Sequence, residues 1–531
     1  MLKQTKNNAF LSIFRLYTSV AATAIKPQTV AAPAKKQKPL ISCKRTQFNL
    51  YVPAPVDSEF GTIPLAASGW KHYKSKDDFM IFNATLSKAA IQAEMQNIAE
   101  FLSTNNISLN EKLLENLKND FNINAFTNIQ TKAIPKVYDS HHVLIAAETG
   151  CGKTLAYMLP ILQQVIERKQ AWNSTQPEKS KRKFNTPLAI IITPGRELAA
   201  QIGTVAEKLC QQTDVQIKTI LGGNTKRLMV NPEFADVDVI VATVGALSKL
   251  VTTGIYRMEE VRHVVLDEAD TLLDDSFSDK LGYFLRRFPF HKNHTQDEHT
   301  VGTQLILASA TMPTNTEEIL QKVIDVQTLH EVASPNLHKL MPHVEQRFMR
   351  ISKQSRPSNL LNLVKKDIAK KQPVIVFSNR SATSDFVDIF LNNNGVRSVN
   401  LNGDMLMKIR IGRFEQFQDG KYDVLSTTDI GSRGLDTTSA RHVINFDFPL
   451  HVSDYIHRCG RIGRVGNLTQ SLVTNFISSR REVEVVQKIE HAARTGGLLP
   501  NVNANIKNII NKRILKDMQA AGIATPEEEA F

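Results

Sequence analysis

The chain has 531 residues, of which 42% are hydrophobic and 22% charged, a composition typical of globular proteins. This length predicts two or three domains and excludes a small disulfide-stabilised scaffold. No stretch approaches the roughly 18 apolar residues needed to cross a bilayer, so we expect no membrane insertion. The four cysteines, Cys43, Cys151, Cys210 and Cys459, form no C-x-x-C pair, which argues against a zinc site and suits a reducing compartment.

The positive charge is concentrated at the N-terminus. The chain carries 65 basic and 52 acidic residues, a net charge of +13, and residues 1–56 contain nine of the basic residues and no acid. The rest of the chain is therefore close to neutral. If the residues after 56 bind nucleic acid, their basic side chains must therefore cluster on one part of the surface.

The acid-free start resembles a targeting signal. Phe10, Phe14 and Tyr17 recur about one helical turn apart among basic residues, which is typical of an amphipathic mitochondrial presequence. We therefore expect the mitochondrial matrix. The alternative is a basic arm, centred on 35–38, that binds RNA or directs nuclear import.

From residue 95 to 490, short apolar runs alternate with longer amphipathic segments. Strands buried on both faces by crossover helices give such continuous runs, so two series predict two α/β domains with parallel sheets. The first series is 143–146, 188–192, 239–242, 264–266 and 305–308; the second is 374–377, 398–401, 424–426, 443–446 and 472–476. Two polar insertions, 169–186 and 291–303, should be exposed loops.

These patterns divide the chain into six segments. Residues 26–55 are rich in Pro, Ala, Lys and Gln, a composition that predicts a linker outside any core. We predict a presequence and basic linker over 1–56, a disordered N-terminal extension over 57–94, a first domain over 95–334, a linker over 335–345, a second domain over 346–490 and a short helical C-terminal tail over 491–531.

A phosphate-binding loop follows the first predicted strand. Gly150 and Gly152 let the backbone turn so that amide groups and a helix N-terminus face the phosphates of ATP, while Lys153 reaches the outer phosphates and the Thr154 hydroxyl coordinates Mg²⁺. A chance glycine-rich turn is the alternative, and the strand before the loop and the helix after it argue against that. The loop residues predicted to bind ATP are Thr149, Gly150, Cys151, Gly152, Lys153 and Thr154.

Two carboxylates follow another buried run. Asp267 would hold the water shell of Mg²⁺, and Glu268 would orient or deprotonate the attacking water. Taken alone, the stretch is also compatible with solvated acids that cap a strand before a helix. Its pairing with the phosphate loop favours an ATPase site.

At this point the chain resembles the DEAD-box RNA helicases of superfamily two, most closely an animal mitochondrial member. The motifs that carry the resemblance stand in family order over roughly 390 residues: FTNIQ at 126–130, the phosphate loop, PGRELA at 194–199, GG at 222–223, DEAD at 267–270, SAT at 309–311, VFSN at 376–379, TDI at 428–430, RGLD at 433–436 and HRCGRIGR at 457–464. The family implies two tandem RecA-like domains.

The resemblance also implies roles at the nucleotide. Gln130 would read adenine through its amide, Asp436 would meet the ribose, and Arg461 and Arg464 would act as arginine fingers on the γ-phosphate. Together with Lys153, Asp267 and Glu268, the two arginines form the predicted catalytic set. The same spacing of three includes Arg458, which we also expect to face phosphate.

Further roles concern coupling and RNA. Ser309 and Thr311 would bond near Asp270 and His457, and so couple the ATP site to domain closure. RNA would be held by its backbone, without sequence preference. The predicted RNA-binding residues are Pro194, Arg196, Gly223, Thr243 and Gly245 in the first domain and Asn379, Gly403 and Thr428 in the second.

Some positions depart from the family pattern. Gly195 stands in place of a Thr, Val244 and Ala246 replace a Pro and an Arg, and Met407 replaces a Gln. The first domain could therefore hold RNA more loosely. Phe101 lies farther upstream of the adenine-reading glutamine than is usual for the stacking aromatic, so we doubt that it stacks on adenine.

Two charged clusters have simpler explanations. The histidines and acids of 291–299 could chelate zinc, but they lack ordered spacing and fit a solvated loop. The basic run 179–183 could be a nuclear signal, and a flexible loop that attracts RNA fits it better.

The sequence thus predicts a monomeric, ATP- and Mg²⁺-dependent RNA helicase that remodels structured RNA, with mitochondrial ribosomal large-subunit precursors as the expected substrate. The alternatives are an RNA-binding assembly scaffold whose ATPase is incidental and, more weakly, a DNA translocase.

Overall fold

The computed structural model describes residues 39–53, 63–86, 92, 94–175, 183–223, 225–273, 278–290, 302–311, 320–432, 437, 439–464, 471–500 and 502. The predictions for the presequence, for the clusters at 179–182 and 291–299, for Asp436 and for the tail beyond 502 lie outside these residues. Within the described ranges, no helix combines the length and apolar character that a membrane span requires.

The first sheet has seven parallel strands in the order β11-β5-β10-β9-β6-β8-β7. Its inner strands are buried along their whole length, because helices cover both faces. The strands are β5 (His142–Ala146), β6 (Ala189–Thr193), β7 (Ile217–Ile220), β8 (Val239–Thr243), β9 (His263–Asp267), β10 (Gln304–Ser309) and β11 (Leu329–Ala333).

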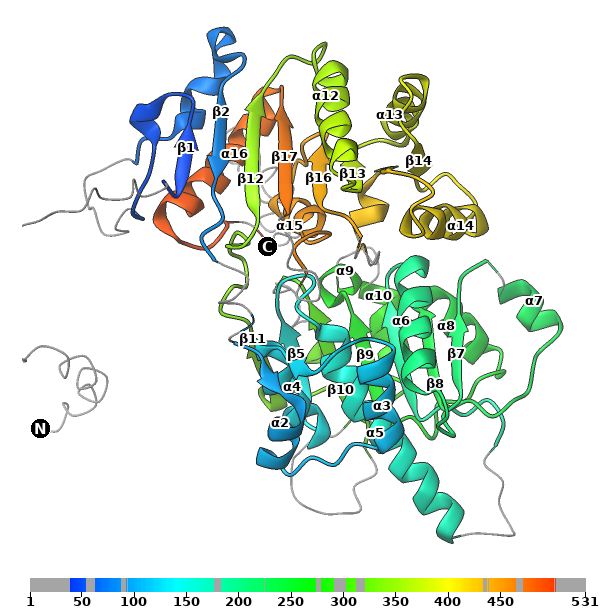
Figure 1. The fold of residues 1–531 in the computed structure, drawn as a ribbon. Helices are drawn as coiled ribbons and strands as arrows, with labels where there is room; N and C mark the ends of the chain where they lie inside the picture. The colour runs from blue at the N-terminus through cyan, green and yellow to red at the C-terminus, as the bar shows by residue number, and fades with distance from the viewer. Residues whose placement is uncertain are drawn as a thin grey trace, which may run out of the picture. The chain divides into compact units, whose positions relative to one another are not determined.

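The helices of this domain join successive strands, as the labels in Figure 1 show. They are α2 (Ile98–Thr104), α3 (Glu111–Asn119), α4 (Asn128–Tyr138), α5 (Lys153–Thr175), α6 (Arg196–Leu209), α7 (Thr225–Val230), α8 (Val244–Thr252), α9 (Ala269–Leu272) and α10 (Ser278–Leu285), with a short ladder between β3 (Gln96–Asn97) and β4 (Ala125–Phe126) and the 3₁₀ turn η4 (Val326–Thr328).

The second sheet has eight strands in the order β1-β2-β12-β17-β16-β13-β15-β14. The six from β12 onward are parallel, and β1 and β2 are antiparallel additions at one edge. The strands are β1 (Ile41–Cys43), β2 (Phe79–Phe82), β12 (Glu345–Arg350), β13 (Val374–Phe377), β14 (Ser398–Leu401), β15 (Val424–Thr427), β16 (His442–Asn445) and β17 (Leu472–Ile477).

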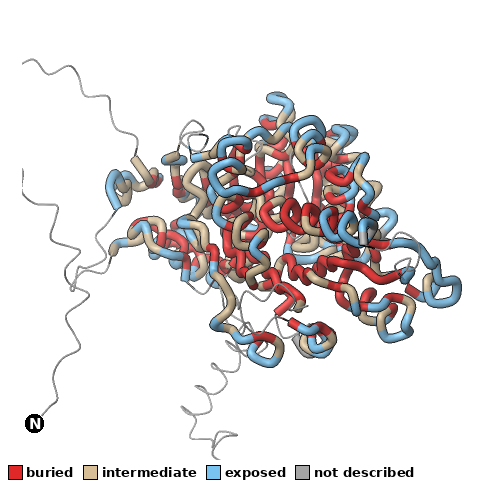
Figure 2. Tube along the Cα trace, turned by 90° about the horizontal axis from the view of Figure 1, so that it is seen from below, coloured by how far each residue is buried: buried red, intermediate tan, exposed pale blue. Residues whose placement is uncertain are grey.

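Helices α12 to α16 complete the second domain, and the predicted class of two α/β domains with parallel sheets is confirmed. Figure 2 shows the buried residues concentrated in the interior and the exposed ones in the outer turns and helices. The helices are α12 (Arg356–Ala369), α13 (Ser381–Asn393), α14 (Met407–Gln418), α15 (Val452–Cys459) and α16 (Arg480–Thr495), and the 3₁₀ turns are η1 (Thr46–Phe48), η2 (Ala66–Lys71), η3 (Tyr73–Ser75) and η5 (Asp429–Ser432).

All ten predicted apolar runs match strands to within one residue, whereas β1 to β4, β7, β11 and β12 were not predicted. In the first sheet, β7 and β11 are the two edges, so they are only partly buried and carry polar residues. β12 reads EQRFMR, with buried and half-buried residues in alternation. A continuous apolar run identifies only strands that are covered on both faces.

The segment before the first domain belongs to the second sheet. β2 pairs with β12, where Met80 lies opposite Phe348, and β1 pairs with β2. Ile41 and Cys43 are buried on either side of Ser42, which is a period-two pattern. The prediction that residues 26–55 stay outside any core is therefore wrong for this strand, because three alternating residues are too few to stand out in a Pro- and Lys-rich stretch. The prediction of disorder over 57–94 is likewise wrong for η2 and β2, whose residues Trp70 and Met80 are buried in the second domain.

A buried ion pair anchors this segment on α16. The Glu490 carboxylate accepts hydrogen bonds from the backbone N–H groups of Ala66 (2.7 Å) and Ala67 (2.8 Å), and it pairs with Arg494 at 2.8 Å. α16 continues to Thr495, and Val502 is buried in the same core, so the second domain extends past the predicted boundary at 490.

Two connectors join the sheets. The backbone N–H groups of Thr85 and Leu86, which follow β2, both donate to the carbonyl of Pro342, at 2.7 and 3.0 Å. Pro342 lies in the predicted linker 335–345. The chain therefore passes between the domains twice, along two strands of backbone that are hydrogen-bonded to each other.

Candidate nucleotide and nucleic-acid site

The phosphate-binding loop lies between β5 and α5. Gly150 and Gly152 have φ values of +83° and +94°, a left-handed conformation that favours glycine. The Lys153 ammonium donates to the carbonyls of Ala147 (2.6 Å) and Glu148 (2.9 Å), so it lies over the loop at the N-terminus of α5. Thr154 follows in the same helical turn.

Gln130 is tied to this loop. Its Nε2 donates to the Gly152 carbonyl at 3.1 Å, and its Oε1 accepts the backbone N–H of Thr127 at 2.9 Å in a capping box at the start of α4. The Thr127 hydroxyl in turn donates to the Cys151 carbonyl at 2.9 Å. An amide has two N–H groups and two oxygen lone pairs, so each end of Gln130 retains capacity for another partner.

The Asp267 carboxylate is buried at the end of β9. Its Oδ2 accepts the Tyr157 hydroxyl at 2.7 Å, and its Oδ1 accepts the backbone N–H of Glu268 at 2.8 Å. Burial raises the pKa of Asp267, and the Tyr157 hydrogen bond and the positive charge of Lys153 oppose that rise. Glu268 has φ of 52° and ψ of 51°. This left-handed conformation is uncommon for residues other than glycine, and it indicates a functional constraint on Glu268.

The predicted coupling residues lie together. Asp270 Oδ2 accepts the Thr311 hydroxyl at 2.8 Å and its backbone N–H at 3.1 Å, and His457 Nε2 lies 3.7 Å from the same oxygen. The Ser309 hydroxyl donates to the Thr311 carbonyl. A carboxylate after β9 thus contacts the SAT motif after β10 and the histidine on α15 of the second domain.

The turn with the two predicted arginine fingers lies against the phosphate loop. A Cβ added to Gly150 would come within 2.6 Å of Arg464 Cγ, and one added to Gly460 would overlap the Thr149 side chain. Arg461 is buried, and its Nε lies 3.3 Å from the His457 carbonyl. The backbone at Gly460 therefore approaches the loop closely, because only the hydrogen of glycine leaves room there.

The prediction that Arg458 faces phosphate is wrong. Its side chain is fully buried and donates to Asp429 at 2.6 and 3.0 Å and to Asn379 at 2.7 Å, inside the second domain. α15 ends at Cys459, so Arg458 lies in the last turn of that helix and is buried against the domain, whereas Arg461 and Arg464 lie in the turn that follows.

The predicted RNA-binding residues follow the carboxyl ends of parallel strands. Arg196 begins α6 after β6 and lies over the glycine turn after β7, with its Nη1 3.6 Å from a Cβ built on Gly223. The remaining residues are Pro194 after β6, Thr243 and Gly245 at β8 and α8, and Asn379, Gly403 and Thr428 after β13, β14 and β15.

The Asn379 side chain is held by bonds within the second domain, and one N–H group and one oxygen lone pair of its amide remain for another partner. Its Oδ1 accepts from Arg458, its Nδ2 donates to the Phe448 carbonyl at 3.0 Å, and its backbone N–H donates to Asp447 at 3.1 Å. The geometry supports a structural role for its side chain, which stabilises the turn after β13.

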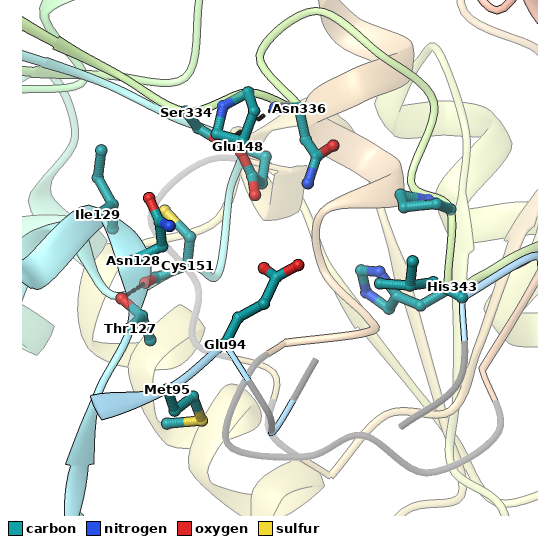
Figure 3. Close-up of a pocket in the computed structure, with 13 residues that line it drawn as sticks. Glu94, Met95, Thr127, Asn128, Ile129, Glu148, Cys151, Ser334, Asn336 and His343 are labelled. Carbon is teal, nitrogen blue, oxygen red and sulfur yellow. Dashed lines mark hydrogen bonds between the residues drawn. The ribbon is translucent and has the colours of Figure 1, made fainter. Parts of the chain in front are cut away.

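A cavity of about 90 Å³ opens beside the phosphate loop (Figure 3). Glu94 extends toward it between Asn128 on one side and His343 on the other. Both connectors contribute to its walls. The lining residues are Leu86, Glu94, Met95, Thr127, Asn128, Ile129, Glu148, Cys151, Ser334, Pro335, Asn336, Pro342 and His343.

Phe101 does not reach this cavity. It is 1% exposed and packs edge-to-face on Phe126, with ring centroids 5.3 Å apart, in the core of the first domain. The doubt about Phe101 is therefore justified, and among the lining residues Met95 and Ile129 offer apolar side chains in the place of an aromatic ring.

Three contacts at the site were not predicted. Tyr157 bonds to Asp267, His343 Nε2 lies 2.6 Å from the Gly463 carbonyl, and Arg410 pairs with Glu197 at 2.7 Å in a buried setting. Only the first had a signal in the sequence: Tyr157 stands four residues after Lys153, on the same face of the helix.

The comparisons with known proteins agree with this geometry. Residues 127–319 match the family model of the DEAD/DEAH box helicase, and residues 355–466 match that of the helicase conserved C-terminal domain. The probable ATP-dependent RNA helicase DDX28 of Mus musculus is 34% identical and that of Homo sapiens 33%, each over 88% of this chain and 86% of the relative.

Bacterial relatives and solved structures extend the comparison. The ATP-dependent RNA helicase RhlB of Shewanella woodyi is 31% identical over 68% of this chain and 76% of the relative. S. cerevisiae Dbp5 bound to RNA and ADP BeF3 has a TM-score of 0.61 at 22% identity, over 78% of this chain and 99% of that one. Mss116 bound to ssRNA and UDP-BeF has a TM-score of 0.60 at 21% identity, over 77% and 79%.

The RecA-like fold of both domains is confirmed by these structures. The motif order, the two family models and the mammalian relatives, which match along most of their length, agree with one another. The chain belongs to the DEAD-box family of ATP-dependent RNA helicases.

Proposed function

We propose that this RNA-dependent ATPase hydrolyses ATP at a site divided between its two domains, with Lys153, Asp267 and Glu268 from the first and Arg461 and Arg464 from the second. The observation that carries the proposal is the contact of the Arg464 side chain with the phosphate loop at Gly150. Arginine groups of this kind stabilise charge that develops on the transferring phosphoryl group. Neither domain alone would then hydrolyse ATP.

The residues present fit Mg²⁺. Asp267 offers a carboxylate held by two hydrogen bonds, and Thr154 offers a hydroxyl beside Lys153, which is a donor set of hard oxygens. Mg²⁺ held by Thr154 and, in part through water, by Asp267 would neutralise phosphate charge. Glu268 would take a proton from the attacking water.

Gln130 and Asp436 would recognise the rest of the nucleotide. The free N–H and lone pair of the Gln130 amide suit the paired donor and acceptor of adenine, and Thr127, which bonds to Gln130, lines the cavity. Asp436 would meet the ribose. An adenine preference over guanine in ATPase assays tests this role.

RNA would lie across the carboxyl ends of the strands in both domains. Arg196 and Gly223 from the first domain, and Gly403 and Thr428 from the second, offer backbone and cationic groups that suit phosphates and 2′-hydroxyls. The Asp270, Thr311 and His457 contacts would transmit RNA and ATP binding to each other, since both ligands favour the same arrangement of the domains.

The decisive experiment measures ATP hydrolysis with and without single-stranded RNA. We expect RNA to stimulate the wild type, and Arg464→Ala to lower the stimulated rate by about 10³-fold or more while nucleotide binding persists. Arg286→Ala, an exposed arginine after α10, is the matched control. A stimulated rate of Arg464→Ala equal to that of the control would refute the divided site.

The compartment and the RNA are inferred from the sequence. The acid-free N-terminus supports import into the mitochondrial matrix, and this compartment suggests precursors of the large ribosomal subunit as substrate, acted on by a monomer. Crosslinking in cells followed by sequencing of the bound RNA tests both ideas. Recovery of nuclear RNA alone would favour the nucleus instead.

A further inference from the structure

We propose that a surface on the second domain is an additional binding site for single-stranded RNA, separate from the proposed RNA site at the carboxyl ends of the β-strands. This basic platform consists of Lys71, Tyr73, Lys74 and Lys76 from η2 and η3, with Arg480 and Arg481 from the start of α16. The inference deepens the proposed function and rests on it, because it names a second contact with the same RNA.

The platform residues project into solvent. Tyr73 is 69% exposed, the Lys71 side chain is 46% exposed, and Lys74 and Lys76 are also exposed. His72 lies beside Tyr73, with ring centroids 4.5 Å apart and an angle of 34° between the planes. Lysines interleaved with exposed aromatic rings are the combination that holds phosphates and bases of single-stranded RNA.

The backbone beneath these side chains is fixed. Trp70 is 1% exposed and Ser75 is 7% exposed, so the segment is buried at both ends while the residues between face outward. The Ser75 hydroxyl donates to the carbonyls of Trp70 (3.1 Å) and His72 (2.6 Å). A surface that is already ordered loses little conformational entropy on binding, in contrast to a disordered basic tail.

Two contacts bring α16 into the platform. Arg350 donates from Nε to the Trp70 carbonyl at 2.9 Å and from Nη1 to the Ile477 carbonyl at 3.1 Å, just before α16 begins. Lys71 pairs with Glu484, in the second turn of the helix, at 3.4 Å. Arg480 and Arg481, both exposed in the first turn of α16, therefore extend the positive charge of residues 71–76.

The charge distribution favours RNA over a protein partner. The acids nearby are Glu484, which pairs with Lys71, Asp78, which pairs with Arg45 at 3.3 Å, the exposed Asp77, and the buried Glu482, which pairs with Arg356 at 3.3 Å. The cations of the platform and Lys44 outnumber them, so a polyanion is attracted. The aromatic pair is small and rimmed by lysines, which suits one or two stacked bases and not a broad apolar contact.

The platform should matter only for long RNAs. A short RNA reaches only the site at the carboxyl ends of the β-strands. A longer or structured RNA can reach both that site and the platform, and the second contact then raises its affinity through effective concentration. The platform would therefore set which RNAs are held without changing the chemistry of ATP hydrolysis.

The test uses the full chain and a triple variant, Lys71→Ala with Tyr73→Ala and Lys74→Ala. The matched control removes two exposed lysines and one exposed aromatic elsewhere in the same domain: Lys365→Ala with Lys366→Ala on α12 and Phe386→Ala on α13. Affinity is measured by fluorescence anisotropy for single-stranded RNAs of about 10 and about 30 nucleotides, over a series of salt concentrations.

We expect the platform variant to bind the long RNA about tenfold more weakly than the control does. The slope of log affinity against log salt should become shallower by about 0.7 for each phosphate that the variant no longer neutralises. Affinity for the short RNA and the ATPase rate that it stimulates should be unchanged. Photocrosslinks from the long RNA should map to the peptide that contains residues 71–76.

Equal affinity of the platform and control variants for the long RNA would overturn the inference, whether both bind like the wild type or both are equally weakened. Capture of an acidic protein with no change in RNA binding would overturn it as well. These results are separate from a failure of the proposed function, which would appear as a wild-type ATPase that no RNA stimulates.

Discussion

The Tyr157 hydroxyl donates a 2.7 Å hydrogen bond to Oδ2 of Asp267, and both groups lie in the interior of the first domain. The other carboxylate oxygen accepts the Glu268 N–H, so the two bonds fix the plane of the carboxylate. Burial raises the pKa of Tyr157 well above its ordinary value, which keeps the phenol protonated and able to donate. Tyr157 is therefore a positioning residue for Asp267.

Tyr157→Phe retains the ring and removes only the hydroxyl. A hydrogen bond to a charged group contributes about 1.5 to 3 kcal/mol, so we expect the RNA-stimulated rate to fall by about 10- to 100-fold and the Mg²⁺ requirement to rise. The control is Tyr455→Phe, which removes another buried hydroxyl, bonded to Gln346 at 2.5 Å in the second domain. Equal rates and equal Mg²⁺ titrations in the two variants would contradict the positioning role.

Glu268→Gln should separate binding from turnover. The amide keeps the shape of the side chain but cannot accept a proton, so ATP should bind with little change while hydrolysis is lost and the complex on RNA becomes long-lived. Dissociation from labelled RNA in the presence of ATP measures the lifetime, and Glu259→Gln, at an exposed position, serves as control. Normal turnover in Glu268→Gln would remove this residue from the mechanism.

Glu490→Gln should detach the N-terminal segment from α16. The carboxylate accepts from Ala66, Ala67 and Arg494, and an amide would place a donor against one of these donors in a buried site. Because breaking a buried pair leaves an uncompensated charge, we expect a loss of about 3 to 5 kcal/mol in the free energy of unfolding. Chemical denaturation measures it, and limited proteolysis should cut between residues 53 and 83 first.

The matched control is Glu484→Gln. Glu484 lies on the same helix, its side chain is 58% exposed, and it pairs with Lys71 at the surface, so its substitution should change stability little. If both variants unfold at the same denaturant concentration, the buried pair does not anchor the segment.

The four cysteines should resist alkylation until the chain unfolds. Burial raises the pKa of the thiol from 9.0 to about 11 at Cys43 and Cys151, and to about 12 at Cys210 and Cys459. Because thiolate is the reactive form, iodoacetamide at pH 8 should label few sites in the folded protein and all four in denaturant, as counted by mass spectrometry. Rapid labelling of native Cys151 would contradict its burial in the phosphate loop.

The same shifts predict the sign of a pH effect. The folded pKa values lie above the unfolded value, so the neutral thiols stabilise the fold fully below pH 9. This contribution is lost as the pH rises from 9 through 11 to 12, since the unfolded chain ionises first. Replacement of Cys210 by Ala should reduce the decrease in the free energy of unfolding between pH 9 and 12. If this pH dependence is the same in the variant and the wild type, ionisation of Cys210 does not contribute to it.

Local patterns predicted much of the site correctly. Gly150 and Gly152 were expected to turn the backbone under the phosphates, and both have positive φ. The resemblance to the helicase family implied that Thr311 bonds near Asp270, and its hydroxyl donates to Asp270 at 2.8 Å. Both cases depend on short stretches of chain at the ends of fully buried strands, where the parallel register places consecutive motifs at one edge of a sheet.

Arg458 and β1 show where such patterns fail. Whether an arginine faces solvent, phosphate or an interior carboxylate depends on what packs around it, and Asp429 and Asn379, which enclose Arg458, come from distant parts of the chain. The pairing of β2 with β12, which brings β1 into the same sheet, is similarly a contact between residues more than 260 positions apart. The sequences of β1 and β2 do not indicate which strand each one pairs with.

By itself, then, the sequence determined the two α/β domains, the phosphate loop and the order of the motifs, because hydrophobic periodicity and backbone freedom are properties of neighbouring residues. The tertiary structure alone decided that the segment before the first domain completes the second sheet, that Tyr157 holds Asp267, and that Arg464 rather than Arg458 lies at the phosphate loop. Those outcomes arise from packing and hydrogen bonding between segments remote in the chain, and their free energy exists only once the segments meet.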